Sequence, residues 1–153
     1  MLVKDVMVKP VFTVSEGETF PQIVKLLARK QVSGVSVVNK KGRLVGVISE
    51  KDLLHKLFPS EREFYKNLEY YKNFERIEHE AEKIKKLTAK KIMTKNVVTI
   101  EPDRHVLVAC SLMSIHNIRR LPVVHGDKIV GIVTMGSLYK NYLSFLLKAR
   151  QDS

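Results

Sequence analysis

The chain has 153 residues, of which 44% are hydrophobic and 28% charged, and its formal net charge is +11. This composition is ordinary for a folded globular protein, and no apolar run approaches the roughly 18 residues that a membrane-spanning helix needs. The start of the chain lacks the apolar core of a signal peptide, and a single cysteine excludes an intrachain disulfide and a cysteine zinc site. We therefore expect one domain, or two small halves sharing a core, in a cytoplasmic protein without a membrane partner.

The first 58 residues contain a pattern that returns after residue 88. A methionine with a threonine six positions later occurs in both copies, as Met7 with Thr13 and as Met93 with Thr99. A glycine-containing apolar segment that ends in a hydroxyl residue also occurs twice, at 44–49 and 129–134. A duplicated unit of about 50 to 60 residues predicts two halves that pack together and form ligand clefts between them, which indicates binding rather than a single catalytic centre.

Each copy predicts the order β-α-β-β-α after a short helical turn, at 3–7 in the first copy and 89–93 in the second. The strands are expected at 11–14, 35–38 and 44–48, and again at 97–100, 121–124 and 129–133. A helix begins at Thr19, because Pro21 suits a first turn and Gln22 completes a capping box. Further helices begin near Glu50 and Met135. The continuous apolar character of the middle strands predicts burial on both faces.

The segment between the copies, 59–88, has no glycine and no proline after Pro59. Ser60 and Glu63 predict another capping box. Apolar residues recur every three or four positions: Phe64, Leu68, Tyr71, Phe74, Ile77, Ala81, Ile84 and Leu87. We expect one apolar stripe on a long helix or a helical hairpin, which packs either on the chain's own repeats or on a second copy to form a homodimer.

The polar residues after the third strand are the first candidates for a binding site. Ser49 stands at an expected helix start and Asp52 lies one turn further, where a serine caps the helix and a carboxylate favours its dipole. This structural role does not compete with binding, since a helix N-terminus offers N–H groups to an anion and a carboxylate accepts hydrogen bonds from a ribose diol. The second copy has Thr134 and Ser137 instead, so we expect the two clefts to bind differently.

Arg119 and Arg120 are the second candidates, because they precede a buried strand and arginine suits bidentate contact with phosphate. A solvated arginine pair in a loop is the alternative. Ser33 and Gly34 occupy the matching places in the first copy. If a cleft draws on both copies, the carboxylate of Asp52 and the arginine pair would serve one nucleotide.

These features together resemble a tandem cystathionine-β-synthase (CBS) domain pair, also called a Bateman module. The motifs that carry the resemblance are the repeated Met-then-Thr opening, the Arg-Leu-Pro-Val-Val strand and the Gly-h-h-[Ser/Thr]-x-x-Asp ending. It covers 1–58 and 89–148, and it leaves 59–88 as an insertion and 149–153 as a tail. The resemblance implies an α+β fold in which two CBS repeats pack about a pseudo-two-fold axis, with a long helical insertion between them.

The resemblance further implies a regulatory module, not an enzyme, that binds AMP, ADP, ATP or S-adenosylmethionine in the cleft between the repeats. Binding would change the conformation and so signal to a regulated protein that the sequence does not name. The implied roles are adenine contact by Thr13 and Thr99; walls for the base from Val35 and Val37 or from Leu121 and Val123; ribose and phosphate contact by Ser49 with Asp52; and phosphate contact by Arg119 and Arg120. Val14, Ile100, Thr134 and Ser137 complete the expected ligand-binding residues. Ser137 departs from the usual aspartate, and the cation-poor cleft of the first copy suits adenosine or S-adenosylmethionine.

No residue pattern supports catalysis, a metal site or a cofactor other than the regulatory ligand. The five histidines lack metal-ligand spacing, and Cys110 lies on the apolar stripe of a helix. Residues 89–153 carry 10 basic and 4 acidic groups, which leaves a nucleic-acid-binding protein as an alternative, although no aromatic residue stands among the basic ones to stack on bases. A CBS dimerisation module without a ligand is the other alternative.

Overall fold

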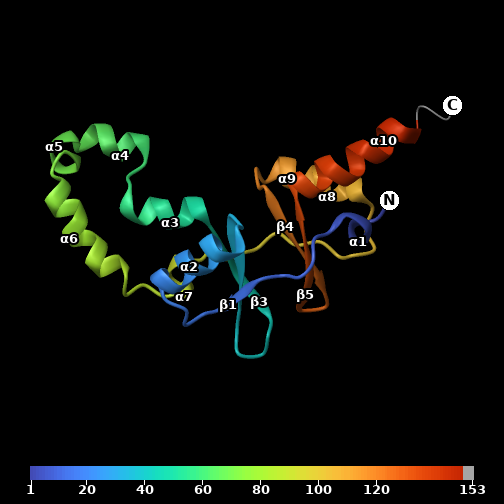
Figure 1. The fold of residues 1–153 in the computed structure, drawn as a ribbon, viewed down its shortest axis with the longest axis horizontal. Coiled ribbons are helices and arrows are strands. Elements are labelled where there is room, and N and C mark those ends of the chain that lie inside the picture. The colour runs from blue at the N-terminus through green and yellow to red at the C-terminus, as the bar shows by residue number, and fades with distance from the viewer. Residues whose placement is uncertain (150–153) are drawn as a thin grey trace. The chain divides into compact units, whose positions relative to one another are not determined.

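The structure is a computed structural model that describes residues 1–149 (Figure 1). The chain forms two compact units. Unit 1 contains residues 1–12, 42–44 and the chain from 97 onward, and unit 2 contains 13–41 and 45–96. The units do not coincide with the sequence repeats, because each unit takes its opening segment from the other repeat. Of the expected tail, residues 150–153 lie outside the described part.

Unit 2 is built on a sheet of β1 (Thr13–Ser15), β2 (Gly34–Val38) and β3 (Leu44–Ser49), in that order. β1 runs parallel to β2 and places Thr13 opposite Ser36. The helix between them, α2 (Phe20–Lys30), begins as expected, since the Thr19 N–H donates to Gln22 Oε1 at 2.8 Å. α2 buries one face in this unit, and the predicted burial of β2 on both faces is confirmed.

Unit 1 contains the antiparallel pair β4 (Arg120–His125) and β5 (Lys128–Thr134). The strand expected at 97–100 is wrong, because only Ile100 forms a bridge, to Val123. The Ile100 N–H donates to Pro122 O at 3.1 Å and Ile100 O accepts from the Val124 N–H at 2.9 Å. The next bond of a parallel ladder would need an N–H from Pro122, which proline lacks. Ser36 has that N–H in unit 2, so β1 continues there.

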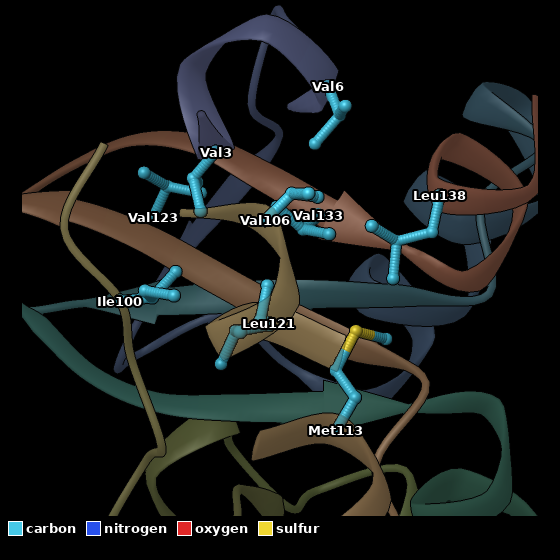
Figure 2. Close-up of a cluster of buried hydrophobic side chains, with 10 residues drawn as sticks. Val3, Val6, Ile100, Val106, Met113, Leu121, Val123, Val133 and Leu138 are labelled. Carbon is cyan, nitrogen blue, oxygen red and sulfur yellow. The ribbon is translucent and has the colours of Figure 1, made fainter. Parts of the chain in front are cut away.

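The core of unit 1 lies between this sheet and the helices α1 (Val3–Val6) and α8 (Val106–Ile115). Figure 2 shows side chains of this core pointing toward one another. The cluster of buried side chains comprises Val3, Val6, Ile100, Val106, Ala109, Met113, Leu121, Val123, Val133 and Leu138. After β5 the structure describes α9 (Met135–Ser137), a π-helix η1 (Leu138–Leu143) and α10 (Ser144–Ala149).

The two opening segments are exchanged between the repeats. Met7, after α1, lies against Gly131 of β5, and Met93, after α7 (Ala89–Ile92), lies against Gly46 of β3. At both glycines a Cβ atom would overlap the methionine side chain. The repeated glycine is therefore required by the close approach of a methionine from the other repeat.

Backbone hydrogen bonds fix the same exchange. Val8 and Ile132 bond each other in both directions, at 2.8 and 3.2 Å. Thr94 and Val47 do so in unit 2, at 2.9 and 3.1 Å. Each opening segment thus adds a short antiparallel bridge to a strand of the other repeat.

The insertion forms three short helices, α4 (Glu61–Lys66), α5 (Leu68–Tyr71) and α6 (Phe74–Ile84), rather than one long helix. They follow α3 (Glu50–Leu57) and are drawn in green in Figure 1. The breaks fall at Asn67 and Asn73, and Asn73 Oδ1 accepts from the Arg76 N–H at 3.1 Å. Asparagine competes with helical bonding in this way, which the apolar spacing does not reveal. The capping box of Ser60 and Glu63 is confirmed. Within residues 1–149 no helix is long and apolar enough to cross a membrane.

Candidate ligand-binding sites

The clearest candidate is a carboxylate held at the start of α3. Ser49 caps the helix, and its Oγ accepts from the Asp52 N–H at 3.2 Å. In return, the N–H and the hydroxyl of Ser49 donate to Asp52 Oδ2 at 2.8 and 3.0 Å. Oδ1 of Asp52 has no hydrogen-bond partner among the described residues, and the side chain is half-buried. The carboxylate is therefore fixed in orientation while one oxygen stays available to accept hydrogen bonds from a ligand.

The sheet brings further polar residues near this carboxylate. The Glu50 N–H donates to Ser33 O at 3.0 Å, which joins the start of α3 to the start of β2. Further along β2, Ser36 lies opposite Thr13. The three residue steps from Ser33 to Ser36 span roughly 10 Å along the strand, at about 3.3 Å per residue. This length matches a small organic molecule rather than a single ion. We call Thr13, Ser49 and Asp52 the Asp52 site, and all three belong to unit 2. Ser36 is 1% exposed, so its hydroxyl is not open to a ligand in this structure.

The valines expected at the first cleft lie in the core of unit 2. Val14, Val35 and Val37 are 5%, 3% and 0% exposed. Successive side chains of a strand alternate between its faces, so Val35 and Val37 share one face of β2 while Ser36 lies on the other, the face of Thr13. Sequence reasoning did not predict that Ser36, which is 1% exposed, lies on the face of Thr13, because an apolar strand buried on both faces does not indicate which face carries a site. Side chains alternate between the two faces of a strand, and Thr13 pairs with Ser36 in the parallel sheet. This alternation is the signal that could have placed Ser36 on the face of Thr13.

The matching region of unit 1 carries the arginines. The Met135 N–H donates to Arg119 O at 3.2 Å, and Arg120 pairs with Thr134 across the sheet. The arginine pair therefore lies beside the start of α9. Arg119 is exposed and Arg120 half-buried. We call Thr99, Arg119, Arg120, Thr134 and Ser137 the Arg119 site.

The helix cap of the Arg119 site leaves no acceptor comparable to Asp52. The Thr134 N–H donates to Ser137 Oγ, and the Ser137 hydroxyl donates to Thr134 O, both at 3.0 Å. The Ser137 N–H donates to Thr134 Oγ1, also at 3.0 Å. Ser137 is 7% exposed, so its hydroxyl is used inside the cap.

The apolar residues expected at the second cleft also lie in a core. Ile100, Leu121 and Val123 are 5%, 0% and 0% exposed and belong to the cluster of Figure 2. The alternation places Pro122, like Ser36 in unit 2, on the strand face of Thr99. Each unit thus contains a threonine, a middle strand and a helix cap in the same arrangement. The carboxylate of Asp52 lies in unit 2, whereas Arg119 and Arg120 lie in unit 1.

In residues 1–149, the cysteine, histidine and carboxylate side chains outside the two candidate sites form no additional reactive or metal-binding site. Burial raises the pKa of the Cys110 thiol, which keeps the half-buried sulfur protonated and poorly nucleophilic. No group of three histidine, cysteine or carboxylate side chains that could hold a metal ion occurs in residues 1–149.

Comparison with known proteins identifies the family. A family model described as "CBS domain" matches residues 3–59 and 89–144. The chain belongs to the CBS domain family. This membership confirms the resemblance found in the sequence and the α+β fold of two CBS repeats.

Relatives of the CBS pair extend over nearly the whole chain. An uncharacterized protein of Methanocaldococcus jannaschii is 33% identical over 150 residues, which cover 90% of this chain and 89% of that protein. The solved CBS domain pair of protein MJ0100, in complex with 5'-methylthioadenosine and S-adenosyl-L-methionine, is 28% identical with a TM-score of 0.70, covering 94% of this chain and 97% of that chain. CBSX2 of Arabidopsis thaliana in complex with AMP is 25% identical with a TM-score of 0.72, at the same coverage of both chains. Other curated relatives are longer, and this chain covers 22% and 38% of two of them.

Proposed function

We propose that this chain is a regulatory module that binds an adenosine derivative through the Asp52 site. The observation that carries the proposal is the fixed carboxylate, with Oδ2 held by Ser49 and Oδ1 available at the surface of unit 2. The two hydroxyls of a ribose need such an acceptor, and hydrogen bonds to charged groups contribute about 1.5–3 kcal/mol each. The complexes of two relatives with AMP and with methylthioadenosine and S-adenosylmethionine support this ligand class.

The charge near the site favours a ligand with few phosphates. The positions that match Arg119 and Arg120 are Ser33 and Gly34, which offer no cation. The carboxylate of Asp52 would also repel a polyphosphate placed close to it. Methylthioadenosine and S-adenosylmethionine should therefore bind more tightly than ATP.

Regulation requires the ligand to favour one conformation of the chain over another. A 100-fold difference in affinity between two conformations corresponds to about 2.7 kcal/mol, which lies within the usual range of coupling energies. The partner that responds to this change would be a separate protein or a second copy of the chain.

Isothermal titration calorimetry of the purified chain with methylthioadenosine, S-adenosylmethionine, AMP and ATP tests the proposal. We expect at least one dissociation constant below about 1 mM, and a loss of 10- to 100-fold in Asp52→Ala, as the removal of a charged hydrogen-bond acceptor predicts. If none of the four binds below 1 mM, the chain is not an adenosine sensor. If Asp52→Ala binds as tightly as the wild type, the ribose assignment is wrong.

Glu63→Ala supplies a matched control. Glu63 Oε2 accepts from the N–H and the hydroxyl of Ser60 at 3.0 and 2.9 Å, the same arrangement as at Asp52. Its removal abolishes a capping box in α4 without touching the Asp52 site. Ligand affinity should stay at the wild-type value in Glu63→Ala, so a loss confined to Asp52→Ala is not a general effect of an uncapped helix.

A further inference from the structure

The insertion lines a hollow that shares no residue with the Asp52 site. It has a volume of about 310 Å³ and lies between the end of α3 and the helices α4 to α6, within unit 2. The hollow is open to solvent on one side, and its lining is more polar than apolar. Sites for small molecules begin at about 300 Å³, so the hollow has the size of a site for a small polar molecule.

The side of α6 that faces the hollow carries a carboxylate between two isoleucines. Ile77, Glu80 and Ile84 all line the hollow, and their spacing of three and four positions places them on one face of the helix. All three are half-buried, whereas Glu78 and Glu82 are exposed. Packing does not explain a carboxylate on this face, because the burial of a charge is unfavourable unless a partner compensates it.

The partner that Glu80 has within the chain is easily replaced. Lys83 Nζ lies 3.2 Å from Glu80 Oε1, and the Lys83 side chain is 69% exposed. Exposed ion pairs of this kind contribute little to stability, so the ammonium group of a ligand can take the place of Lys83. Glu63 brings a second carboxylate to the lining from α4, and its Oε2 accepts two hydrogen bonds from Ser60.

A positive group lines the same hollow. Lys56 belongs to the end of α3, which packs against α6. A purely anionic ligand would be repelled by Glu63 and Glu80, and a purely cationic one by Lys56. Arg76 also lies over the ring of Tyr70, 4.5 Å from its centroid, so this aromatic face already has a cation. A molecule that carries both an ammonium and a carboxylate group has a charged partner for each.

The rest of the lining suits an apolar group. It includes Leu57 and Tyr71, both half-buried, besides the isoleucines of α6. A cavity of about 150 Å³ accommodates benzene, so the hollow has room for a large apolar side chain as well as two charged groups. We propose that it binds a free α-amino acid with a large apolar side chain, whose ammonium contacts Glu80 and whose carboxylate contacts Lys56. Most of the lining belongs to residues 60–88, which the family model does not match.

Amide NMR chemical shifts of the full chain test the proposal, with L-leucine, L-methionine and L-phenylalanine as probes. We expect at least one dissociation constant below about 1 mM, with the shift changes concentrated in residues 55–84. For each probe, the analogue without the carboxylate and the analogue without the ammonium should bind about 10-fold more weakly or worse. For L-phenylalanine these analogues are phenethylamine and 3-phenylpropionate.

Two charge-removing variants with matched controls test the contacts. Glu80→Gln and Lys56→Gln should each weaken amino-acid binding about 10-fold or more. Glu78→Gln on α6 and Lys51→Gln on α3 remove the same charges from the same helices outside the hollow, so they should bind as the wild type does. Asp52→Ala should also retain amino-acid binding, which separates this site from the proposed adenosine site.

Several results would overturn the amino-acid site. These are a panel in which no probe binds below 1 mM, analogues that bind as tightly as the amino acid, shift changes outside 55–84, and variants of Glu80 and Lys56 that match their controls. None of these results bears on the adenosine proposal, which depends on its own titrations.

Discussion

The two units share one plan and differ at the two places where a ligand would bind. In both, a hydroxyl residue caps the helix after the third strand of the repeat, and a methionine lies against a glycine of that strand. They differ in the residue three positions after the cap, which is Asp52 or Ser137, and at the start of the middle strand. The shared features serve folding, so the differences indicate where the two copies have acquired separate uses.

The cap itself shows that the fold does not require a carboxylate. Ser137 closes the cap of α9 with hydrogen bonds to Thr134 and offers no charged acceptor. Asp52 closes the equivalent cap of α3 and retains Oδ1 for another partner. The charge of Asp52 thus exceeds the structural need, which is the physical reason for assigning it to a ligand.

The largest effect on stability should come from the shared methionine-on-glycine contact. A Cβ at Gly46 would lie 2.8 Å from Met93 Cβ, whereas a Cβ at Gly131 would lie 3.1 Å from Met7 Cβ. We expect Gly46→Ala to lower the free energy of unfolding by about 1–3 kcal/mol and Gly131→Ala to lower it less. Urea unfolding of both variants measures the difference.

The double variant Gly46→Ala/Met93→Ala tests whether steric overlap causes the loss of stability, since Met93→Ala removes the side chain that the new methyl group would overlap. The double variant should be more stable than additivity of the two single effects predicts. Additive effects would show that the overlap is not the source of the loss.

Converting the helix cap of unit 1 into that of unit 2 should change the affinity for AMP, an effect of intermediate size. Ser137→Asp places a carboxylate beside Arg119 and Arg120. If the arginines then contact phosphate, AMP should gain about tenfold in affinity at unit 1, which corresponds to about 1.4 kcal/mol. Calorimetry would record this gain as a second AMP per chain.

Ser137→Asn is the control, because the amide oxygen of asparagine can accept the hydrogen bond from the Thr134 N–H without adding a charge. It should leave the AMP stoichiometry of the wild type unchanged. A single AMP per chain in Ser137→Asp would show that the carboxylate alone does not distinguish the units.

The smallest expected effect is a change in stability, and it comes from an ion pair of unit 1 whose matching residues in unit 2 cannot form one. Lys4 Nζ lies 2.7 Å from Asp103 Oδ1, while the matching residues in unit 2 are Lys90 and Gly17. The hydrogen bond from Lys4 lowers the pKa of Asp103 below its usual range. The carboxylate therefore stabilises the fold above the ordinary range of an aspartate, and this contribution disappears as pH falls through the lowered pKa.

Asp103→Asn should consequently lower the melting temperature slightly at neutral pH and not at all in strong acid. Both partners are at least half exposed, so added salt should also remove the difference. Differential scanning calorimetry at two pH values and two salt concentrations measures it. A difference that persists in high salt would contradict an electrostatic origin.

Local features of the fold could be predicted well from the sequence. The capping boxes at Thr19 and Ser60 and the helix cap at Ser49 occur as expected, because each depends on residues only three positions apart. The middle strands were likewise evident from their apolar runs. The apolar spacing of the insertion predicts one long helix or a helical hairpin, and it does not locate the breaks at Asn67 and Asn73, which depend on the preference of asparagine for helix ends.

Features that depend on distant contacts could not be predicted in this way. The shortened strand before Ile100 reflects a proline on its neighbour, and the side of Ser36 depends on its register with Thr13. The residues of the two candidate sites are predictions from the sequence, and so is their division, since the carboxylate stands in the first copy and the arginines in the second. The exchange of the opening segments, which brings Met7 to Gly131 and Met93 to Gly46, is signalled by no local pattern of residues.

The exchange also affects how the protein is made. Met7 and Gly131 are 124 positions apart in the chain, and a ribosome adds about 5–20 residues per second. The first helix therefore waits for roughly 6 to 25 s before the strand that receives it has been synthesised. During this interval Val3 and Val6 have no core to enter, so the nascent chain presents a short apolar segment that chaperones can hold until translation is nearly finished.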